Sequence, residues 1–489
     1  MRKMKITLKQ TQGITLILLM MMAAFAGCIG GDDTDDDTST STATDSSSST
    51  AETSDTSDSS DTSDSSDSSD TSDTSDTSDT SDTSDSDGSD GSESSDSSSS
   101  DSSGGSAVST MDGEDGGYTY ASNVDNHRSL MADMCDIKAH ANAGEWTAAK
   151  GIYTNGKNAE KSDGSYRTLQ GFAAASGKNH GYDTFYNTTG AVDAMIMDAL
   201  EGTGDFAGVS DTVRYQGIAK LTANLGMVAY TIHELNSAIA KADAGNVDND
   251  TGAPHNWDEG WAFFHGPDEN VGCSPVATLN KRGADFGTEH SEGMANTTYH
   301  IQQSMIAGLA ALQASDSTGY TDATNDVVKQ VIIAYSQAVL KYTYKMDSAD
   351  SGEKYQAEAY AFWKTIEAYA APYTDNACYN MNTHTMGWVG SSDATACEAF
   401  TWTQYQGQGD YMCYNTVSHT VAMGITSEAD CNKFGEMPYH YENYGATSMN
   451  NILDLQDSSV LGTSYDVTAW LQPVWDHYGI TAEEIGSYS

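Results

Sequence analysis

The stretch IAKLTANLGMVAYTIHELNSAI, from Ile218 to Ile239, carries the clearest structural signal in the chain. Its apolar residues recur at intervals of three and four positions, a spacing that predicts an α-helix with a continuous apolar seam. The seam consists of Ile218, Leu221, Leu225, Val228, Ile232, Leu235 and Ile239. The opposite face is also largely apolar, and a helix that is apolar all round is expected to be buried.

Two later segments show the same helical spacing. One runs from Val327 to Tyr342 and the other from Ala357 to Ala371. Alternating patterns typical of strands are scarce, and the 489 residues include only six prolines. We therefore predict a mainly α-helical fold, a helical bundle in the folded part of the chain.

The predicted buried helix contains an adjacent His233 and Glu234. The pair resembles the start of the zinc-protease motif H-E-x-x-H, but Ser237 stands where that motif needs its second histidine. A buried carboxylate is costly unless it is paired, protonated or bound to a metal. Two interpretations stay open: metal ligands, or a structural pair in which Glu234 accepts hydrogen bonds from a Tyr or Lys and His233 meets a backbone carbonyl.

A second group of polar residues lies in HNWDEGWAFFHG, residues 255–266. His255 and Glu259 are four positions apart, so they share one face if this segment is helical. Asp258 and Glu259 stand between tryptophans, where two acids are hard to keep wholly in solvent. The structural alternative is an aromatic core helix whose acids favour an exposed N-terminus.

The chain then repeats this arrangement. AYTIHELNSAIAKAD (229–243) precedes DEGWAFFHG (258–266), and AYSQAVLKYTYKMD (334–347) precedes AEAYAFWKT (357–365). Glu259 aligns with Glu358. Two such helix pairs, packed about a pseudo-twofold axis, would bring the two glutamates towards each other. Paired carboxylates near a histidine in a helical bundle suit hard or borderline metals such as iron.

The N-terminus predicts export. A basic start is followed by a short apolar run, Ile14–Ala26, which ends in Phe25-Ala26-Gly27-Cys28. The run is too short for a comfortable membrane span. We predict a lipoprotein signal peptide over residues 1–28, with Cys28 as the lipidated first residue of the mature chain. An uncleaved anchor and an ordinary signal are the alternatives.

Residues 29–117 form a linker of nearly pure Ser, Thr, Asp and Gly, with repeats such as TSDTSDTSDTSD. They cannot bury enough apolar surface to fold, so we expect a disordered spacer between the membrane and a domain at 118–489. A calcium-collecting acidic tail is the functional alternative.

The net charge limits which classes of partner are plausible, and the cysteine count indicates an oxidising compartment. The chain holds 22 basic and 71 acidic residues, a net charge of −49, which argues against nucleic acid and anionic lipid as partners. That charge suits cation capture and equally suits salty surroundings. Six cysteines besides Cys28 predict up to three disulfides in an exported protein, and the four within 378–431 predict a locally stapled segment.

Several motifs, taken in order, resemble one family. They are IYTNGKNAEKSDGSYRTLQGF (152–172), TGDFAG (203–208), AYTIHELNSAI (229–239), NWDEGWAFFHG (256–266), LNKRGADFGT (279–288) and KMDSADSGEKYQAEAYAFW (345–363). Together they resemble the Fe-assimilating, low-iron-inducible periplasmic proteins first associated with algae. The closing DVTAWLQPVWDHYGITAEEIG (466–486) is similar to that family's C-terminal end, and 373–465 is interpreted as a Cys-containing insertion.

The resemblance implies an exported or cell-surface protein that assists iron uptake by binding or concentrating iron near a transporter. We expect it to be a non-enzymatic iron-binding lipoprotein. The matched residues able to bind metal are His233, Glu234, Asp258, Glu259, Asp285 and Glu358. Of these, Glu234, Glu259 and Glu358 are expected as carboxylate ligands, and His233 as a ligand or the partner of one. Lys281 and Arg282 could pair with acids or hold an anion bound with Fe(III), and a buried ion pair is the preferred interpretation.

Two other functions compete. One is an imelysin-like surface metallohydrolase, against which Ser237 argues, because a second histidine is missing there. The other is an adhesion or structural surface module. The tether and the acidic, Tyr-rich composition support it, and N-x-S/T sites at Asn187, Asn249 and Asn296 would allow glycosylation.

Overall fold

The structure is a computed structural model that describes residues 113–175, 181–390, 393–404, 407–436 and 439–488. The predicted signal peptide, Cys28 and nearly all of the predicted linker lie outside the described residues. In the described residues, no helix has the length and apolar character needed to cross a membrane.

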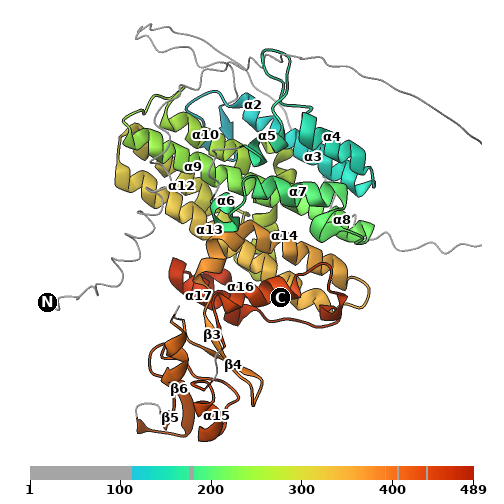
Figure 1. Ribbon diagram of the computed structural model, residues 1–489. Coiled ribbons are helices and arrows are strands. Elements are labelled where there is room, and N and C mark those ends of the chain that lie inside the picture. Colours follow the sequence, from blue (N-terminus) through green and yellow to red (C-terminus); the bar gives the residue numbers. More distant parts are fainter. Residues whose placement is uncertain (1–112, 176–180, 391–392, 405–406, 437–438, 489) are drawn as a thin grey trace, which may run out of the picture. The chain divides into compact units, whose positions relative to one another are not determined.

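Helices dominate the described chain, which confirms the predicted mainly α-helical fold (Figure 1). The α-helices are α2 (Asp125–Arg128), α3 (Leu130–Asn142), α4 (Trp146–Asn155), α5 (Leu169–Ala173), α6 (Tyr182–Tyr186), α7 (Ala191–Glu201), α8 (Asp211–Lys220), α9 (Met227–Asp243), α10 (Ala253–Phe264), α11 (Pro275–Phe286), α12 (Asn296–Gln313), α13 (Ser317–Tyr344), α14 (Gly352–Ala370), α15 (Glu428–Asn432), α16 (Tyr444–Ile452), α17 (Thr468–Tyr478) and α18 (Ala482–Ile485).

The long helices α9, α10, α12, α13 and α14 form the centre of the bundle. α9 packs on α10 and α13, while α13 packs on α12 and α14. Figure 1 shows α9, α12 and α13 running side by side. Their apolar faces meet in one core, in which Trp257, Trp261 and Trp363 are at most 1% exposed. The repeated sequence therefore corresponds to two helix pairs, α9–α10 and α13–α14.

The helix predicted from Ile218 to Ile239 contains a π-helical turn, η2 (Leu221–Gly226), between α8 and α9. Two side chains of this turn donate hydrogen bonds to backbone carbonyls at the end of α8. Thr222 Oγ1 donates to the Ile218 carbonyl at 2.6 Å, and Asn224 Nδ2 donates to the Lys220 carbonyl at 2.9 Å. Such side-chain bonds compete with the α-helical ladder, and π turns are frequent at functional sites. The predicted position of the helix is correct, but a simple period of 3.6 residues does not reveal the wider turn.

The folded chain begins with a β-hairpin, β1 (Glu114–Asp115) and β2 (Tyr118–Thr119). Gly116 and Gly117 connect the strands with φ of 54° and 79°, values that a two-residue hairpin turn requires and glycine adopts readily. Trp261 Nε1 donates to the Asp115 carbonyl at 3.0 Å, which fixes the hairpin on α10. The folded domain thus begins slightly before the predicted boundary at 118.

A second module follows α14 and has its own core. Its strands are β3 (Ala377–Asn380), β4 (Thr385–Trp388), β5 (Phe400–Gln404), β6 (Tyr411–Asn415) and β7 (His440–Tyr441). They form a sheet of order β4-β3-β7 and an antiparallel pair β5-β6. The disulfides Cys378–Cys397 and Cys413–Cys431 lie in a small apolar cluster separate from that of the bundle, which confirms the predicted stapled segment.

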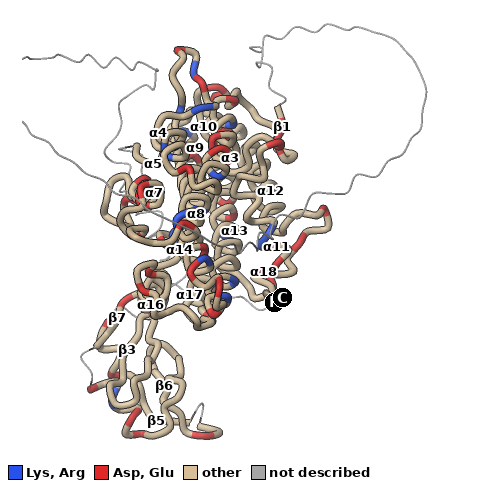
Figure 2. Tube along the Cα trace, turned by 90° about the vertical axis from the view of Figure 1, so that its right-hand side faces the viewer, with Lys and Arg blue, Asp and Glu red and all other residues tan. Residues whose placement is uncertain are grey.

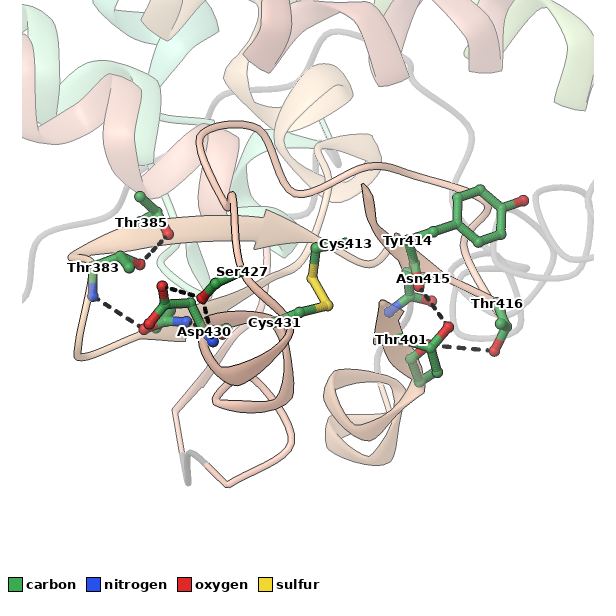
Figure 3. Close-up of a disulfide and its surroundings, with 12 residues drawn as sticks. Thr383, Thr385, Thr401, Cys413, Tyr414, Asn415, Thr416, Ser427, Asp430 and Cys431 are labelled. Atoms are coloured by element: carbon green, nitrogen blue, oxygen red, sulfur yellow. Dashed lines mark hydrogen bonds between the residues drawn. A yellow bond between two sulfur atoms is a disulfide. The ribbon is translucent and has the colours of Figure 1, made fainter. Parts of the chain in front are cut away.

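This module is itself a duplication. CYNMNTHT (378–385) matches CYNTVSHT (413–420), and each copy starts at the first cysteine of its own disulfide. In each copy the tyrosine hydroxyl contacts the histidine Nδ1 at 2.8 Å, and the histidine has a positive φ. Figure 3 shows the start of the second copy, Cys413 to Thr416, with the Cys413–Cys431 disulfide, and Thr383 and Thr385 of the first copy. The repeat is visible in the sequence, but we did not predict it.

The predicted insertion, 373–465, is longer than the separate module. Residues after β7 return to the bundle, where α16 packs on α14 and α17 on α13. Trp363 Nε1 donates to Asn450 Oδ1 at 2.9 Å, and Trp475 Nε1 donates to Ser336 Oγ at 3.1 Å. The third disulfide, Cys135–Cys273, ties α3 to the turn before α11.

Candidate functional site

Glu259 lies at the centre of a buried group of histidine and carboxylate side chains. It is only 9% exposed on α10, and two imidazoles approach the same carboxylate oxygen, Oε1. His255 Nε2 lies 3.1 Å from it, one helical turn away on α10, as the four-residue spacing predicts. His127 Nε2, from the short helix α2, lies 3.3 Å from it.

A second carboxylate completes this group. Asn256 Nδ2 donates to Glu234 Oε2 at 2.5 Å and lies 3.4 Å from Glu259 Oε2, so the amide bridges the two acids. Glu234 is 3% exposed, which confirms that its helix position is buried. Asn256 Oδ1 is buried and has no hydrogen-bond partner in the described part of the chain. We call His127, Glu234, His255, Asn256 and Glu259 the histidine–carboxylate cluster.

Hydrogen bonds on the far side of the His255 ring from Glu259 fix the tautomer of the neutral imidazole. Ser122 Oγ donates to Asp258 Oδ2 at 2.7 Å, so it accepts the proton of His255 Nδ1, which lies 2.9 Å away. A neutral His255 therefore carries its proton on Nδ1 and turns the lone pair of Nε2 towards Glu259. A lone pair facing a carboxylate oxygen requires a cation between or beside them, either a proton on Nε2 or a metal ion.

Asp258 holds Ser122, and with it the acceptor of His255 Nδ1, in place. It is fully buried and accepts hydrogen bonds from the Tyr118 hydroxyl at 2.6 Å, the backbone N–H groups of Ala121 and Ser122, and the Ser122 hydroxyl. Burial raises the pKa of Asp258 to about 6, although these hydrogen bonds lower it. Its donors come from the N-terminal segment, so this predicted metal ligand anchors residues 118–122 on α10.

Burial sets the charge of the cluster. It lowers the pKa of His127 to about 4, despite the opposing effect of Glu259, so the ring is neutral at neutral pH. Burial would raise the pKa of Glu259, but His127, His255 and a hydrogen bond with Glu234 together lower it below its usual range. The His127 ring is packed between Phe172 and Phe263, at centroid distances of 6.0 and 5.6 Å. The carboxylate thus carries its charge in a largely apolar enclosure, where a cation interacts strongly.

The donor spacing is close to what a shared metal ion needs. Ligand atoms about 2.1 Å from one metal lie roughly 3.0 to 3.4 Å apart in octahedral or tetrahedral arrangements. The two nitrogen–oxygen distances, 3.1 and 3.3 Å, are in this range. However, in the described part of the chain no three His, Cys, Asp or Glu side chains converge on a common point as a formed metal site would. Metal binding would therefore replace the present hydrogen bonds after small side-chain rotations.

His233 lies beside this cluster. Its Nε2 is 3.4 Å from Ser237 Oγ, and its ring lies 5.2 Å from that of Tyr230, which also borders Phe172 and Phe263. Ser237 thus contacts His233 from the position where a zinc protease has its second histidine. Ser122 is 3% exposed and its hydroxyl is directed to Asp258, so its contact with His255 is not the arrangement of an accessible nucleophile.

The structure gives Glu259 and Glu358 different partners, whereas the repeat predicts that the two carboxylates approach each other. Glu358, on α14, has Lys220 as its nearest charged partner at 3.8 Å. Asp285 pairs with Arg282 at 2.9 Å and with Lys341 at 2.8 Å, so it too lies in a cationic environment. Arg282 is buried in an ion pair, as preferred, whereas Lys281 is exposed. The two glutamates diverge because different neighbouring helices cover α10 and α14.

Sequence reasoning missed His127, Ser122 and Asn256 as members of the site. It identified the face that His255 shares with Glu259 but did not count His255 among the metal ligands. His127 and Ser122 are separated from Glu259 by more than 130 residues, and no local spacing links them to it. Asn256 lay inside a motif that we singled out, but we considered only its charged neighbours.

Comparison with protein families places this cluster in a known context. The chain matches the family model described as low iron-inducible periplasmic protein over residues 101–382. The match includes all six predicted metal ligands and the whole histidine–carboxylate cluster, but not 466–486, which we expected to resemble the family's C-terminal end. No curated protein and no solved structure matches the chain. Because the match spans more than half of the 489 residues, the chain belongs to the family of low iron-inducible periplasmic proteins.

Proposed function

We propose that this protein is exported, attached to a membrane through a lipid on Cys28, and binds iron at the histidine–carboxylate cluster to assist iron uptake. Family membership supports the link with iron limitation. The residue types support the metal, because imidazole and carboxylate ligands suit iron. The role is that of a carrier near a transporter and not that of an enzyme.

One observation carries the proposal: the lone pair of His255 Nε2 faces Glu259 Oε1 at 3.1 Å. In the absence of metal, a proton between the two atoms satisfies this contact. An iron ion would replace that proton and the hydrogen bond between Glu234 and Glu259, so binding would release protons. Glu234, Glu259, His127 and His255 would be the ligands, and Asn256 Oδ1 offers a further oxygen.

The exposure of His255 gives the ion a route. Its side chain is 25% exposed, whereas those of His127 and Glu259 are 7% and 12% exposed. The ion would enter along His255 and contact the buried ligands last. A carrier needs such an accessible ligand, because iron that is bound must also leave.

The test is a metal titration of the full chain with Fe(II) under anaerobic conditions, Fe(III), Zn(II) and Ca(II). We expect one tightly bound iron per chain and its loss in the double variant His255→Ala, Glu259→Gln. The matched control is His140→Ala, Glu145→Gln, because His140 and Glu145 form an exposed pair at 2.6 Å that does not belong to the cluster. Thermal unfolding of both variants separates lost binding from lost folding.

Iron binding that is weak, unselective and equal in the two double variants would contradict the proposal. The lipid anchor is tested separately by Cys28→Ala, which should release the protein from membranes in a fractionation experiment. If the variant remains in the membrane fraction, attachment occurs by other means.

A further inference from the structure

A second cluster of charged side chains lies on the aromatic rings between α13 and α14. The rings of Tyr342 and Phe362 stack at 5.7 Å, and Tyr355 stacks on Tyr342 at 6.0 Å. Four cations are arranged over these rings at 4.2 to 5.9 Å from a centroid: Lys220, Arg282, Lys341 and Lys345. We call these four residues the cationic cluster.

The cationic cluster has more positive than negative charges. Glu358 lies 3.8 Å from Lys220, and Asp285 contacts both Arg282 and Lys341. Two further cations, Lys138 and Lys281, act on Lys220 by charge repulsion. Burial and this repulsion lower the pKa of Lys220 to about 8, although Glu358 opposes the change. Among the described residues, the four members of the cationic cluster and two neighbouring lysines thus outnumber the two carboxylates paired with the cluster. The whole chain, in contrast, has only 22 basic residues against 71 acidic ones.

The guanidinium group of Arg282 has more hydrogen-bond donors than its neighbours have acceptors for them. The residue is 4% exposed, yet two of its three guanidinium nitrogens, Nε and Nη1, are buried and find no hydrogen-bond partner among the residues that the structure describes. Nη2 pairs with Asp285 at 2.9 Å, and the guanidinium also interacts with Tyr342, whose ring centroid lies 5.1 Å away. A guanidinium cannot lose its charge in a protein, and a buried charged donor without a partner is costly. Such orphaned donors indicate a ligand that supplies acceptors.

The junction between α8 and the π-helical turn positions Lys220 at the cationic cluster. Lys220 is the last residue of α8, and the π-helical turn η2 starts directly after it. About a quarter of its side chain, 27%, is exposed, so a ligand from solvent can reach it. Figure 2 shows basic positions on α8 and α11 within a chain whose charged positions are mostly acidic.

We propose that the cationic cluster binds a small oxyanion with two or more negative charges, held by Lys220 and the unpaired nitrogens of Arg282. Oxyanions accept charge-assisted hydrogen bonds from guanidinium and ammonium groups, and the excess of cations favours multivalent over monovalent anions. The site shares no residue with the histidine–carboxylate cluster. Anion binding therefore goes beyond the proposed iron binding, and the two proposals can be tested independently.

Two sources supply such an anion, inorganic phosphate or sulfate and organic polycarboxylates such as citrate. Calorimetric titration of the full chain with phosphate, sulfate and citrate, at constant ionic strength adjusted with chloride, distinguishes them. We expect saturable binding of at least one of the three and roughly tenfold weaker binding in Lys220→Met, because one charged hydrogen bond is lost.

The control variant is Lys150→Met, because Lys150 forms an exposed pair with Glu201 outside the cluster. It should bind the anion as the unmodified chain does. We prefer a Lys220 variant to an Arg282 variant because the side chain of Lys220 is partly exposed, whereas Arg282 is buried. Circular dichroism checks that the Lys220→Met variant is folded. Binding indistinguishable from that of chloride for all three anions, or unchanged affinity in a folded Lys220→Met variant, would overturn the proposal.

Discussion

Glu259 and Glu358 stand at matching positions in two helix pairs of similar sequence, but their surroundings are opposite in chemistry. Both are buried, at 9% and 5% exposure, and each is followed by an aromatic-rich helical turn. Glu259 faces two imidazoles, whereas Glu358 faces the ammonium group of Lys220.

The difference comes from the helices that cover each pair. α2 brings His127 to α10, and the junction of α8 with the π-helical turn brings Lys220 to α14. Local sequence therefore decides that a carboxylate is buried, while the covering helix decides what it can bind. An imidazole lone pair can bind a metal ion in place of a proton. Beside Glu358, in contrast, the ammonium group of Lys220 already supplies the positive charge.

The largest expected effect is on the pH dependence of stability in metal-free protein. The pKa of His127 is about 4 in the folded state, below its ordinary value of about 6.5. Between these values the unfolded chain binds more protons, so stability falls as the pH falls from 6.5 to 4, by about 3 kcal/mol from this group. Urea unfolding at several pH values should show a smaller loss in His127→Gln.

The matched control for that experiment is His140→Gln, because the side chain of His140 is 34% exposed. It should lose stability as the unmodified chain does. Equal acid sensitivity in all three proteins would mean that His127 is not held neutral by burial.

The second prediction separates the two glutamates directly. Glu259→Gln should weaken iron binding roughly 100-fold, because a ligand with a full negative charge is lost. Glu358→Gln should leave the iron affinity unchanged, because its charged partner is Lys220. Competition with a coloured iron chelator measures both. Equal losses would restore the paired-carboxylate site that the repeat suggested, with Glu259 and Glu358 acting on one ion.

The third prediction concerns the hydrogen bonds behind the imidazole. Ser122→Ala removes the acceptor of His255 Nδ1–H, so the ring is free to adopt the other tautomer. Iron affinity should fall roughly tenfold, as for other residues that orient a metal-binding histidine. Ser129→Ala is a control in the same N-terminal region, because its hydroxyl donates only to the Asp125 carbonyl at 2.8 Å. An unchanged affinity in Ser122→Ala would show that the tautomer is fixed elsewhere.

Much of the fold could be predicted because helical periodicity is local. The seam from Ile218 to Ile239, the burial of Glu234 and the shared face of His255 and Glu259 all follow from spacing along one helix. The contact between His127 and Glu259 does not, since it joins segments 132 positions apart and depends on how α2 crosses α10.

The sequence repeat was informative about helices and misleading about the site. It identified two helix pairs, but pairing Glu259 with Glu358 assumed that equivalent residues meet across a symmetry axis. Helix packing is set by the side chains on all faces, and the residues that cover α10 and α14 are not repeated in the sequence. The shorter repeat, at Cys378 and Cys413, was available by the same comparison and predicts the two local disulfides.

The smallest expected effect tests the other side of the comparison, the charge of Lys220. Its folded-state pKa of about 8 lies below its ordinary value of about 10.5, so the unfolded chain binds more protons between these values. Stability should therefore rise with pH from 8 towards 10.5, by about 1 kcal/mol after allowance for solvent screening of a partly exposed side chain. Urea unfolding at pH 7.5 and 9.5 should show this gain in the unmodified chain and in Lys150→Met, but not in Lys220→Met. Saturating phosphate should reduce the gain, because an anion on the cationic cluster favours the charged lysine. A gain that persists in Lys220→Met would assign the effect to other lysines and tyrosines, and would mean that burial does not lower the pKa of Lys220 beside Glu358.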